Sequence, residues 1–399
     1  MENTSTNNNS ITSHYFFSQP HQPFFILAFV NAIISMFSFM LLFKGILPSQ
    51  IMAVDYHAYS LIYMLFTPAF LAFLFTTFPR FSGTEVIIKE EYLPPFWLFL
   101  AGSILLHIGI FFSTFLITLA MILMFAGHLL SSKILMKVYK TSIQENKEDQ
   151  QWILIGMGFG LFAHLLFILN LWIPLLHTFS IQIAIYLYLF LVIFTVAQRM
   201  IPFFAHVTVE KNRERFKVIL GLIVLHVLLE TIQTHSSFLV DILIAYLIGK
   251  ELWQWKLPIT NPNPLVWILI VSLYWVPVAF ALSAITNLLT LINETNFLTL
   301  DIHVLALGFF FTMLIGFGTR VTLGHSGNTM KAGKLTTILF YWTQVVVLIR
   351  IFTSFAVATS WNFVVFFDLS LTVWIVMFAL WASRFFSVLV FGKKLEEKE

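Results

Sequence analysis

The chain lacks cysteine and has few charged residues. With no cysteine among 399 residues, it can form no disulfide, zinc–thiolate site, iron–sulfur cluster or thiol nucleophile. Only 10% of its residues are charged and 59% are hydrophobic, whereas soluble domains carry about 25% charged residues. A chain this apolar cannot cover its surface with polar groups in water. These absences exclude a soluble globular protein and indicate that lipid is the solvent.

The apolar runs have the length of helices. Lipid admits only helices or closed barrels, because every backbone polar group must be paired there. Runs such as 24–43 and 362–382 are continuously apolar, over the roughly 20 residues that a transmembrane helix needs. We predict an all-α membrane protein of about twelve transmembrane helices. The predicted spans are 24–43, 57–79, 94–113, 115–137, 151–172, 176–198, 216–233, 237–255, 264–285, 300–319, 335–357 and 362–385.

The positions of Lys and Arg orient these spans. With twelve spans, 20 of the 22 basic residues lie on one side of the membrane, in loops or at helix ends. The opposite loops hold only Lys44, and Arg350 lies inside the eleventh span. Basic residues favour the cytoplasmic side, so we predict a multi-pass membrane protein with both termini cytoplasmic. Spans 216–233 and 237–255 are the weakest, because they are short and contain ionisable residues.

One transmembrane domain accounts for almost the whole chain. Residues 1–23 contain no Lys or Arg and therefore lack the basic start of a secretory signal peptide. We predict that they form a polar cytoplasmic tail that stays attached. Residues 24–390 are predicted to form the single twelve-helix domain, and 391–399 a charged cytoplasmic tail. The longest connection, about 138–150, is a charged linker, and we predict no soluble domain.

The second, sixth and tenth spans share an outline. Each has a His near its outer end and an Arg at its inner end, in the pairs His57 with Arg80, His177 with Arg199, and His303 with Arg320. The His spacings are 120 and 126 residues and the Arg spacings 119 and 121. This predicts three quasi-repeated arcs of four helices, the outline of the main subunit of haem–copper oxidases. The alternative is that inner helix ends attract Arg anyway.

Ionisable side chains inside the spans gather toward the outer face. Each costs at least about 2.5–3.5 kcal/mol near the bilayer centre, so it is retained for a partner or a function. Asp55 and His57 open one span as Asp301 and His303 open another, with each His roughly one turn below the outer boundary. Two neutral imidazoles at this depth can hold a haem iron between them. The alternative is that each His forms a hydrogen bond to another helix.

Two further positions suggest chemistry. Arg350 lies about 10 Å below the outer surface at 1.5 Å per residue, where it can pair with a haem propionate or with the carboxylate of Asp368 or Asp301. His226 and Glu230 are spaced i, i+4 and share a helix face. That pair suits a metal ligand oriented by a carboxylate or a proton relay, and a structural hydrogen bond explains it equally well.

Several short motifs match the pattern of one family. They are HVLALG at 303–308 continuing to TRVTLGHSG at 319–327, RMIPFF at 199–204, HA at 57–58 with FTTFP at 75–79, and QPFFILA at 22–28. They are similar to H-A-L-x-x-G with R-V-x-L-G-H-T-G, R-x-x-P-F-F, W-H-A-H-E with L-T-A-x-P, and R-P-F-F-L-L-A. These are patterns of the NnrS family, membrane proteins associated with the bacterial response to nitric oxide. The chain resembles that family over essentially its whole length.

The resemblance implies bound haem and copper and a role in protection against nitrosative stress, with nitric oxide or its metal adducts as ligands. The positions that match are His57, His303, His325, Arg199 and Arg320, and more loosely His164 and Arg350. The sequence departs from the family pattern at four positions, where Tyr59 and Ser60 replace the second His and the Glu of W-H-A-H-E, Tyr56 the Trp, and Gln22 the opening Arg. These departures leave copper binding open and spare haem ligation through His57.

The candidate residues fall into two sets. The candidate metal ligands are His57, His303, His325, His226, His177 and His164, and the candidate cofactor-binding residues add Arg350, Arg320 and Arg199. His325 lies about 30 Å from His303 along a continuous helix, so it binds a second cofactor or stabilises its loop. No nucleophile, nucleotide-binding loop or acid–base dyad stands out, so the sequence does not decide whether the protein is an enzyme.

Three functions compete. The first is a haem- and copper-binding membrane protein that senses, sequesters or turns over nitric oxide or its metal adducts. The second is a proton-coupled secondary transporter, although such carriers usually have two six-helix halves. The third is a factor that hands haem or copper to another enzyme. The expected partners are the lipid bilayer, haem and copper, with no nucleic acid; the electron donor and oligomeric state do not follow from the sequence.

Overall fold

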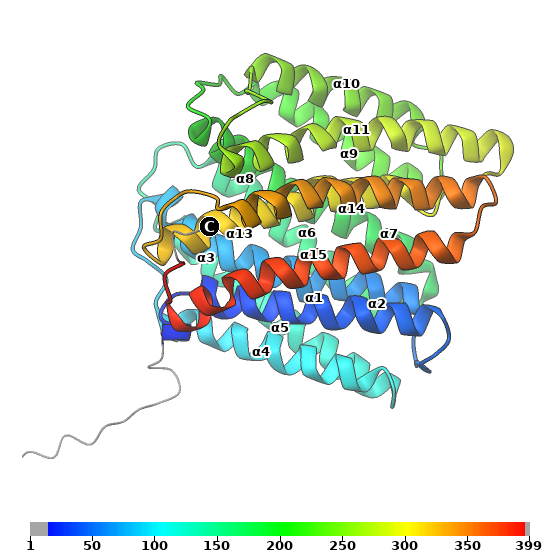
Figure 1. Ribbon diagram of the computed structural model, residues 1–399, viewed down its shortest axis with the longest axis horizontal. Helices are drawn as coiled ribbons and strands as arrows, with labels where there is room; N and C mark the ends of the chain where they lie inside the picture. Colours follow the sequence, from blue (N-terminus) through cyan, green and yellow to red (C-terminus); the bar gives the residue numbers. More distant parts are fainter. Residues whose placement is uncertain (1–14, 396–399) are drawn as a thin grey trace, which may run out of the picture.

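The computed structural model describes residues 15–395, and this part of the chain contains helices and no strands. A single turn (η2, Tyr15–Phe17) precedes twelve long helices that run side by side along the long axis (Figure 1). The first six are α1 (His21–Phe43), α2–η3–α3 (Ala53–Ser82), α4 (Lys89–Gly109), α5 (Thr114–Lys140), α6 (Glu148–Asn170) and η4–α7–η5–α8 (Pro174–Phe204). The second six are α9 (Arg213–Ile232), α10 (Phe238–Trp255), α11 (Pro264–Asn293), α12–η6–α13 (Leu300–His325), α14 (Lys334–Ala358) and α15 (Phe363–Phe391).

The predicted helix count is confirmed. Ten of the helices in the described part of the chain are long and apolar enough to cross a membrane. The other two, α9 and α10, form where the weak spans 216–233 and 237–255 were predicted. At one edge of the bundle α10 packs along α11, and α9 packs against α10 (Figure 1). The protein is therefore a multi-pass integral membrane protein.

The helix ends differ from the predicted spans by a few residues. The first helix begins at His21 instead of residue 24, and the last reaches Phe391 instead of 385. At the tight connection between α4 and α5, the Ser113 side chain accepts a hydrogen bond from the backbone N–H of Leu116 at 3.3 Å and so caps the new helix. Of the predicted polar tails, residues 1–14 and 396–399 lie outside the described residues.

Three helices occupy the centre of the bundle. The most apolar stretches of Ala53–Ser82, Pro174–Phe204 and Leu300–His325 are 89%, 89% and 72% buried, against 22–56% for the other seven candidate spans. These are the second, sixth and tenth helices of the chain, one in each group of four. Because side chains that face lipid are not covered by protein, this difference separates three central helices from a surrounding ring.

Each central helix contains one π-helical segment at a corresponding place. The segments are η3 (Ser60–Phe66), η5 (Ile183–Leu189) and η6 (Leu305–Phe311), and they begin 123 and 122 residues apart. π-helix is rare and is found mostly as single turns, often at functional sites. A preference for Arg at inner helix ends does not explain this spacing. The segments therefore give the predicted threefold quasi-repeat a structural counterpart.

Two of the π-helical segments are stabilised alike. Thr67 donates its hydroxyl to the carbonyl of Ile62, and Thr312 donates to the carbonyl of Leu307, both at 2.8 Å. Each threonine directly follows the last residue of its segment, and its hydroxyl donates to the carbonyl oxygen five residues earlier. This bond matters because lipid offers no hydrogen-bond donor to a carbonyl oxygen left free. The corresponding position in the second copy is Phe190.

The central helices border an apolar space in the half of the bundle nearer their Arg ends. Its volume is about 410 Å³. Among the side chains that line it are Phe70, Phe73, Val196, Phe310, Met313 and Phe317. The centre of the protein is thus a hydrocarbon-like environment, in which a polar group is retained only with a partner.

Candidate functional site

His57 and His303 meet at the outer ends of two central helices. Their ring centroids lie 6.2 Å apart with the ring planes 14° from parallel, and both side chains are half-buried. Two imidazoles that bind one metal through facing nitrogens, with metal–nitrogen bonds of about 2.0–2.1 Å, have centroids about 6 Å apart. The structure thus brings together the two histidines singled out in the sequence, at a spacing that suits a shared metal ion.

The second nitrogen of His303 is held in place. Nδ1 lies 2.9 Å from the carbonyl oxygen of Thr299 and 3.0 Å from Nη2 of Arg350. When Nδ1 carries the proton, it donates to that carbonyl and leaves a lone pair on Nε2, which is the form a metal ligand needs. Arg350 only donates, so in this form it is a neighbour of Nδ1 and not its hydrogen-bond partner. His57 lies flat against Phe39, with ring centroids 4.2 Å apart, and its buried Nδ1 has no hydrogen-bond partner.

Arg350 lies beside this pair and binds neither carboxylate considered for it. It donates to the carbonyl oxygen of Leu298 at 2.7 Å and to the Ser354 hydroxyl at 2.5 Å. Asp368 instead pairs with Lys44 at 2.6 Å. Within the described residues no carboxylate lies within ion-pair distance of this guanidinium, so it is available to a carboxylate brought by a ligand. Two imidazoles and an adjacent Arg fit a haem with propionates.

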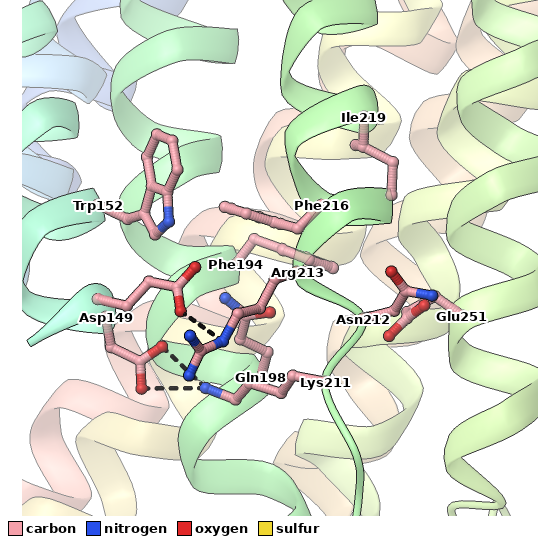
Figure 2. Close-up of a pocket in the computed structure, with 11 residues that line it drawn as sticks. Asp149, Trp152, Phe194, Gln198, Lys211, Asn212, Arg213, Phe216, Ile219 and Glu251 are labelled. Atoms are coloured by element: carbon pink, nitrogen blue, oxygen red, sulfur yellow. Dashed lines mark hydrogen bonds and ion pairs between the residues drawn. The ribbon is translucent and has the colours of Figure 1, made fainter. Parts of the chain in front are cut away.

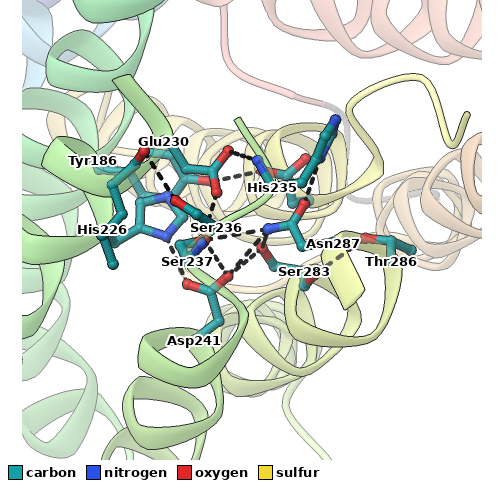
Figure 3. A network of polar contacts seen from close by, with 12 residues as sticks. Tyr186, His226, Glu230, His235, Ser236, Ser237, Asp241, Ser283, Thr286 and Asn287 are labelled. Atoms are coloured by element: carbon teal, nitrogen blue, oxygen red, sulfur yellow. Dashed lines mark hydrogen bonds and ion pairs between the residues drawn. The ribbon is translucent and has the colours of Figure 1, made fainter. Parts of the chain in front are cut away.

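His226 belongs to a polar network between α9, α10 and α11 (Figure 3). Its Nδ1 lies 2.6 Å from Asp241 Oδ1, and both side chains are fully buried. The other carboxylate oxygen of Asp241 accepts from the hydroxyls of Ser237 at 2.7 Å and Ser283 at 2.8 Å, and from the Asn287 amide at 3.4 Å. His226 Nε2 has no hydrogen-bond partner. A carboxylate thus orients the ring and leaves one nitrogen to accept, donate or ligate.

The partner of His226 is not the one that the helix spacing suggested. Glu230 accepts instead from the backbone N–H groups of His235 at 2.9 Å and Ser237 at 3.0 Å (Figure 3). Its carboxylate therefore satisfies two backbone donors in the turn between α9 and α10. The i, i+4 spacing puts Glu230 on the same helix face, but backbone donors just beyond the helix end bind it. The expectation of a His226–Glu230 pair is therefore corrected to His226–Asp241.

A tyrosine connects this network to the His303 helix. The Tyr186 ring lies 4.2 Å from the His226 ring, centroid to centroid, and its hydroxyl donates to Asp301 Oδ2 at 3.0 Å. Asp301 begins the turn that carries His303. Tyr186 belongs to the π-helical segment of the second copy, and Asp301 lies in α12, the short helix that leads into the third segment. Polar groups of two central helices thus converge next to the outer histidine pair.

The remaining outer histidine, His177, is kept apart from this pair. Its Nε2 lies 3.0 Å from Oδ1 of Asp55, which ties the start of the second copy to the start of the first. The structure thus brings two of the three outer histidines together and gives the third a carboxylate partner.

A second pair of histidines lies deeper. His164 packs against His128, with ring centroids 5.8 Å apart and both side chains fully buried. Both ring nitrogens of His128 and the Nδ1 of His164 have no hydrogen-bond partner among the described residues. Each such buried polar atom costs about 1–3 kcal/mol if it stays unpaired. His128 was missed in the sequence because a single His on an apolar helix does not reveal its partner.

The inner end carries basic residues that contact protein groups. The Arg199 guanidinium lies 4.6 Å from the Phe81 ring and donates to Asp149 at 2.9 Å, and Arg320 lies 3.7 Å over the Phe204 ring. These cation–π contacts link the first copy to the second and the second to the third. They give both arginines interhelix partners, and cofactor binding by either one stays a prediction.

His325 also has a neighbour at this end. The His21 ring lies 4.9 Å away, is almost fully buried, and its Nδ1 has no hydrogen-bond partner. The sequence interpretation had placed His21 in a polar tail. The two rings are closer than two ligands on opposite sides of one metal, which are about 6 Å apart at ordinary bond lengths.

A charged pocket of about 420 Å³ lies at the same end (Figure 2). Asp149 accepts from Lys211 at 2.8 Å and Glu148 pairs with Arg213 at 2.8 Å, and Glu251 is bonded to Arg215. Every carboxylate that lines the pocket already has a basic partner. The pocket is therefore an ion-pair network between loops, and it is a weaker ligand site than the outer histidines.

The comparisons with known proteins agree with the motifs. No curated protein matches the chain. The family model described as NnrS protein matches residues 15–391, which include all twelve helices. The chain therefore belongs to the NnrS protein family.

Proposed function

We propose that this protein binds haem and copper in the bacterial cytoplasmic membrane and acts in the response to nitric oxide. The observation that carries the proposal is the approach of the His57 and His303 rings to 6.2 Å between centroids, beside Arg350. Membership of the NnrS family supports the choice of haem over another metal group. His57 and His303 would hold the iron, and Arg350 a propionate.

The protein's own groups limit what bound haem would do. Held by His57 and His303, haem would supply electron transfer. The chain orients His303 through the contact of its Nδ1 with the Thr299 carbonyl and lines the space between the central helices in the inner half with apolar side chains. That space suits a small apolar molecule such as nitric oxide.

Absorption spectroscopy of the protein purified in mild detergent tests the proposal. We expect a Soret band that is lost in His57→Ala and in His303→Ala. His177→Ala is the matched control, since His177 occupies the outer end of the second central helix but is paired with Asp55, and it should keep the band. A folded protein with no haem, or a band that survives both substitutions, would contradict the outer haem site.

The orientation in the membrane has its own test. Since the chain has no native cysteine, Gln50→Cys and Asn146→Cys place single thiols in exposed loops at opposite ends of the bundle. Because basic loops stay cytoplasmic, we expect an impermeant maleimide to label intact spheroplasts at position 50 and not at 146. The reverse pattern would place the histidine pair on the cytoplasmic side.

The two alternative functions make different predictions. A proton-coupled carrier usually has two related six-helix halves, whereas this chain has three corresponding π-helical segments. An assembly factor would release its haem to an acceptor. Transfer of haem from the purified protein to apomyoglobin within minutes would favour that reading over a resident cofactor.

A further inference from the structure

The pair His128 and His164 lies outside the site described above. His128 comes from the middle of α5 and His164 from α6, and neither side chain is exposed at all. Three tyrosines from the central helices surround them. The Tyr63 ring lies flat on His164 with 3.8 Å between centroids, Tyr188 packs against His128 at 5.4 Å, and the Tyr59 hydroxyl is 2.7 Å from His164 Nε2.

The nitrogens of this pair lack partners within the protein. Tyr59 binds one of the four ring nitrogens, and the other three have no hydrogen-bond partner among the described residues. Buried polar atoms are nearly always paired, and three unpaired ones on two touching rings point to a ligand shared by both. Tyr63 and Tyr188 lie in the π-helical segments of the first and second copies, a feature that is frequent at functional sites.

The donor set selects the ligand. Imidazole nitrogens bind transition metals such as copper and zinc, and the 5.8 Å between ring centroids is close to the spacing of about 6 Å for two rings on one ion. No group of three or more His, Cys, Asp or Glu that could hold a metal occurs among the described residues. Zinc normally takes four ligands, whereas Cu(I) accepts two. A monovalent ion also suits a site with no carboxylate, because uncompensated buried charge is costly.

We propose that His128 and His164 form a buried Cu(I) site. This inference deepens the proposed function by naming the residues that bind copper. It rests on that proposed function, which includes copper binding. The site is separate from the outer pair, because it uses α5 and α6 instead of the ends of α2 and α12.

The motif comparison adds a specific consequence. Tyr59 stands where the W-H-A-H-E pattern has its second His, and its hydroxyl contacts Nε2 of His164. That nitrogen is therefore taken, and the unpaired Nδ1 of His164 is left for the metal. Tyr59 thus holds one ligand without adding a third, which leaves the site with two ligands.

Copper binding to the purified full-length protein tests this. Protein in detergent would be loaded anaerobically with Cu(I), washed with the chelator bathocuproine disulfonate, and assayed for copper per chain together with its Soret band. We expect about one retained copper in the wild type, a loss of at least tenfold in affinity in His128→Leu and in His164→Leu, and the same loss with an unchanged Soret band in His128→Gln. His107→Leu is the matched control, a partly buried His bound to Tyr56 at 2.9 Å, and should retain copper.

The two measurements separate the possible failures. Copper retained with no Soret band would refute the outer haem site and leave the copper site standing. A wild type that keeps its Soret band but binds no Cu(I) would refute the copper site and assign the nitrogens to water. Unchanged copper in both leucine variants would refute it as well. Should a leucine variant lose both signals, its fold is damaged, and His128→Gln, which keeps a polar side chain but removes the imidazole ligand, decides: unchanged copper in this variant would refute the site.

Discussion

Asp241→Asn should destabilise the protein more than any loss of one exposed ion pair. Asp241 is fully buried, contacts His226 at 2.6 Å and accepts from two serine hydroxyls. An amide keeps its size but removes the charge and turns one acceptor into a donor. Breaking a buried pair typically costs about 3–5 kcal/mol, so we expect a loss of about 3 kcal/mol in the free energy of unfolding.

Ser283→Ala provides the internal scale for this prediction. It removes one neutral donor to Asp241, and single polar contacts between membrane helices are worth about 0.6 kcal/mol on average and about 1.7 at most. Asp368→Asn is the matched control, since its pair with Lys44 is exposed by 31% and 39% at the two side chains. An exposed pair contributes about 0–1 kcal/mol.

Unfolding in mixed micelles of mild detergent and sodium dodecyl sulfate measures all three. The fraction of dodecyl sulfate at the midpoint, followed by tryptophan fluorescence, should fall most for Asp241→Asn and least for Asp368→Asn. Equal losses in the buried and the exposed variant would refute the reasoning, because they would mean that the network between α9, α10 and α11 contributes no more than a surface pair.

Three further outcomes follow from the structure. Arg350→Lys keeps the charge but loses the planar fork that binds carboxylates bidentately, so haem occupancy in the purified protein should fall while Lys44→Gln leaves it unchanged. Gly160→Ala places a methyl group 2.7 Å from the Tyr188 ring, so overpacking should cost about 1–3 kcal/mol in the same unfolding assay. Arg320→Met removes the contact with Phe204 at 3.7 Å and should cost about 0.5–2 kcal/mol; an unchanged midpoint would return Arg320 to the list of cofactor-binding residues.

The twelve helices could be predicted because hydropathy is a local property. Each span is a run of consecutive apolar residues, and the basic residues at the ends of the runs show which ends lie on the same side of the membrane. The threefold outline was visible in the spacings of His and Arg, yet the π-helical segments that support it were not. A π-helical turn changes one backbone hydrogen bond, and residues such as Leu305 and Phe311 carry no distinctive sign of it.

The partners of buried polar groups were harder to predict than their positions. Depth along a helix placed His57, His303 and Arg350 at one level, and the structure puts them side by side. The same reasoning paired His226 with Glu230, because the sequence shows which residues share a helix face but not which residues of other helices contact that face. Rotation of α9 against α10 instead brings Asp241 to His226.

Sequence alone thus determined the class of protein, the helices and the depth of each ionisable group, because all three depend on consecutive residues and on the cost of charge in lipid. Tertiary structure decided which groups meet. His128 and His164 are on different helices and His21 and His325 are at opposite ends of the chain, so only the packing of helices could pair them. The facing of His57 and His303 also depends on how two central helices turn toward each other, and that rotation is set by every side chain between them.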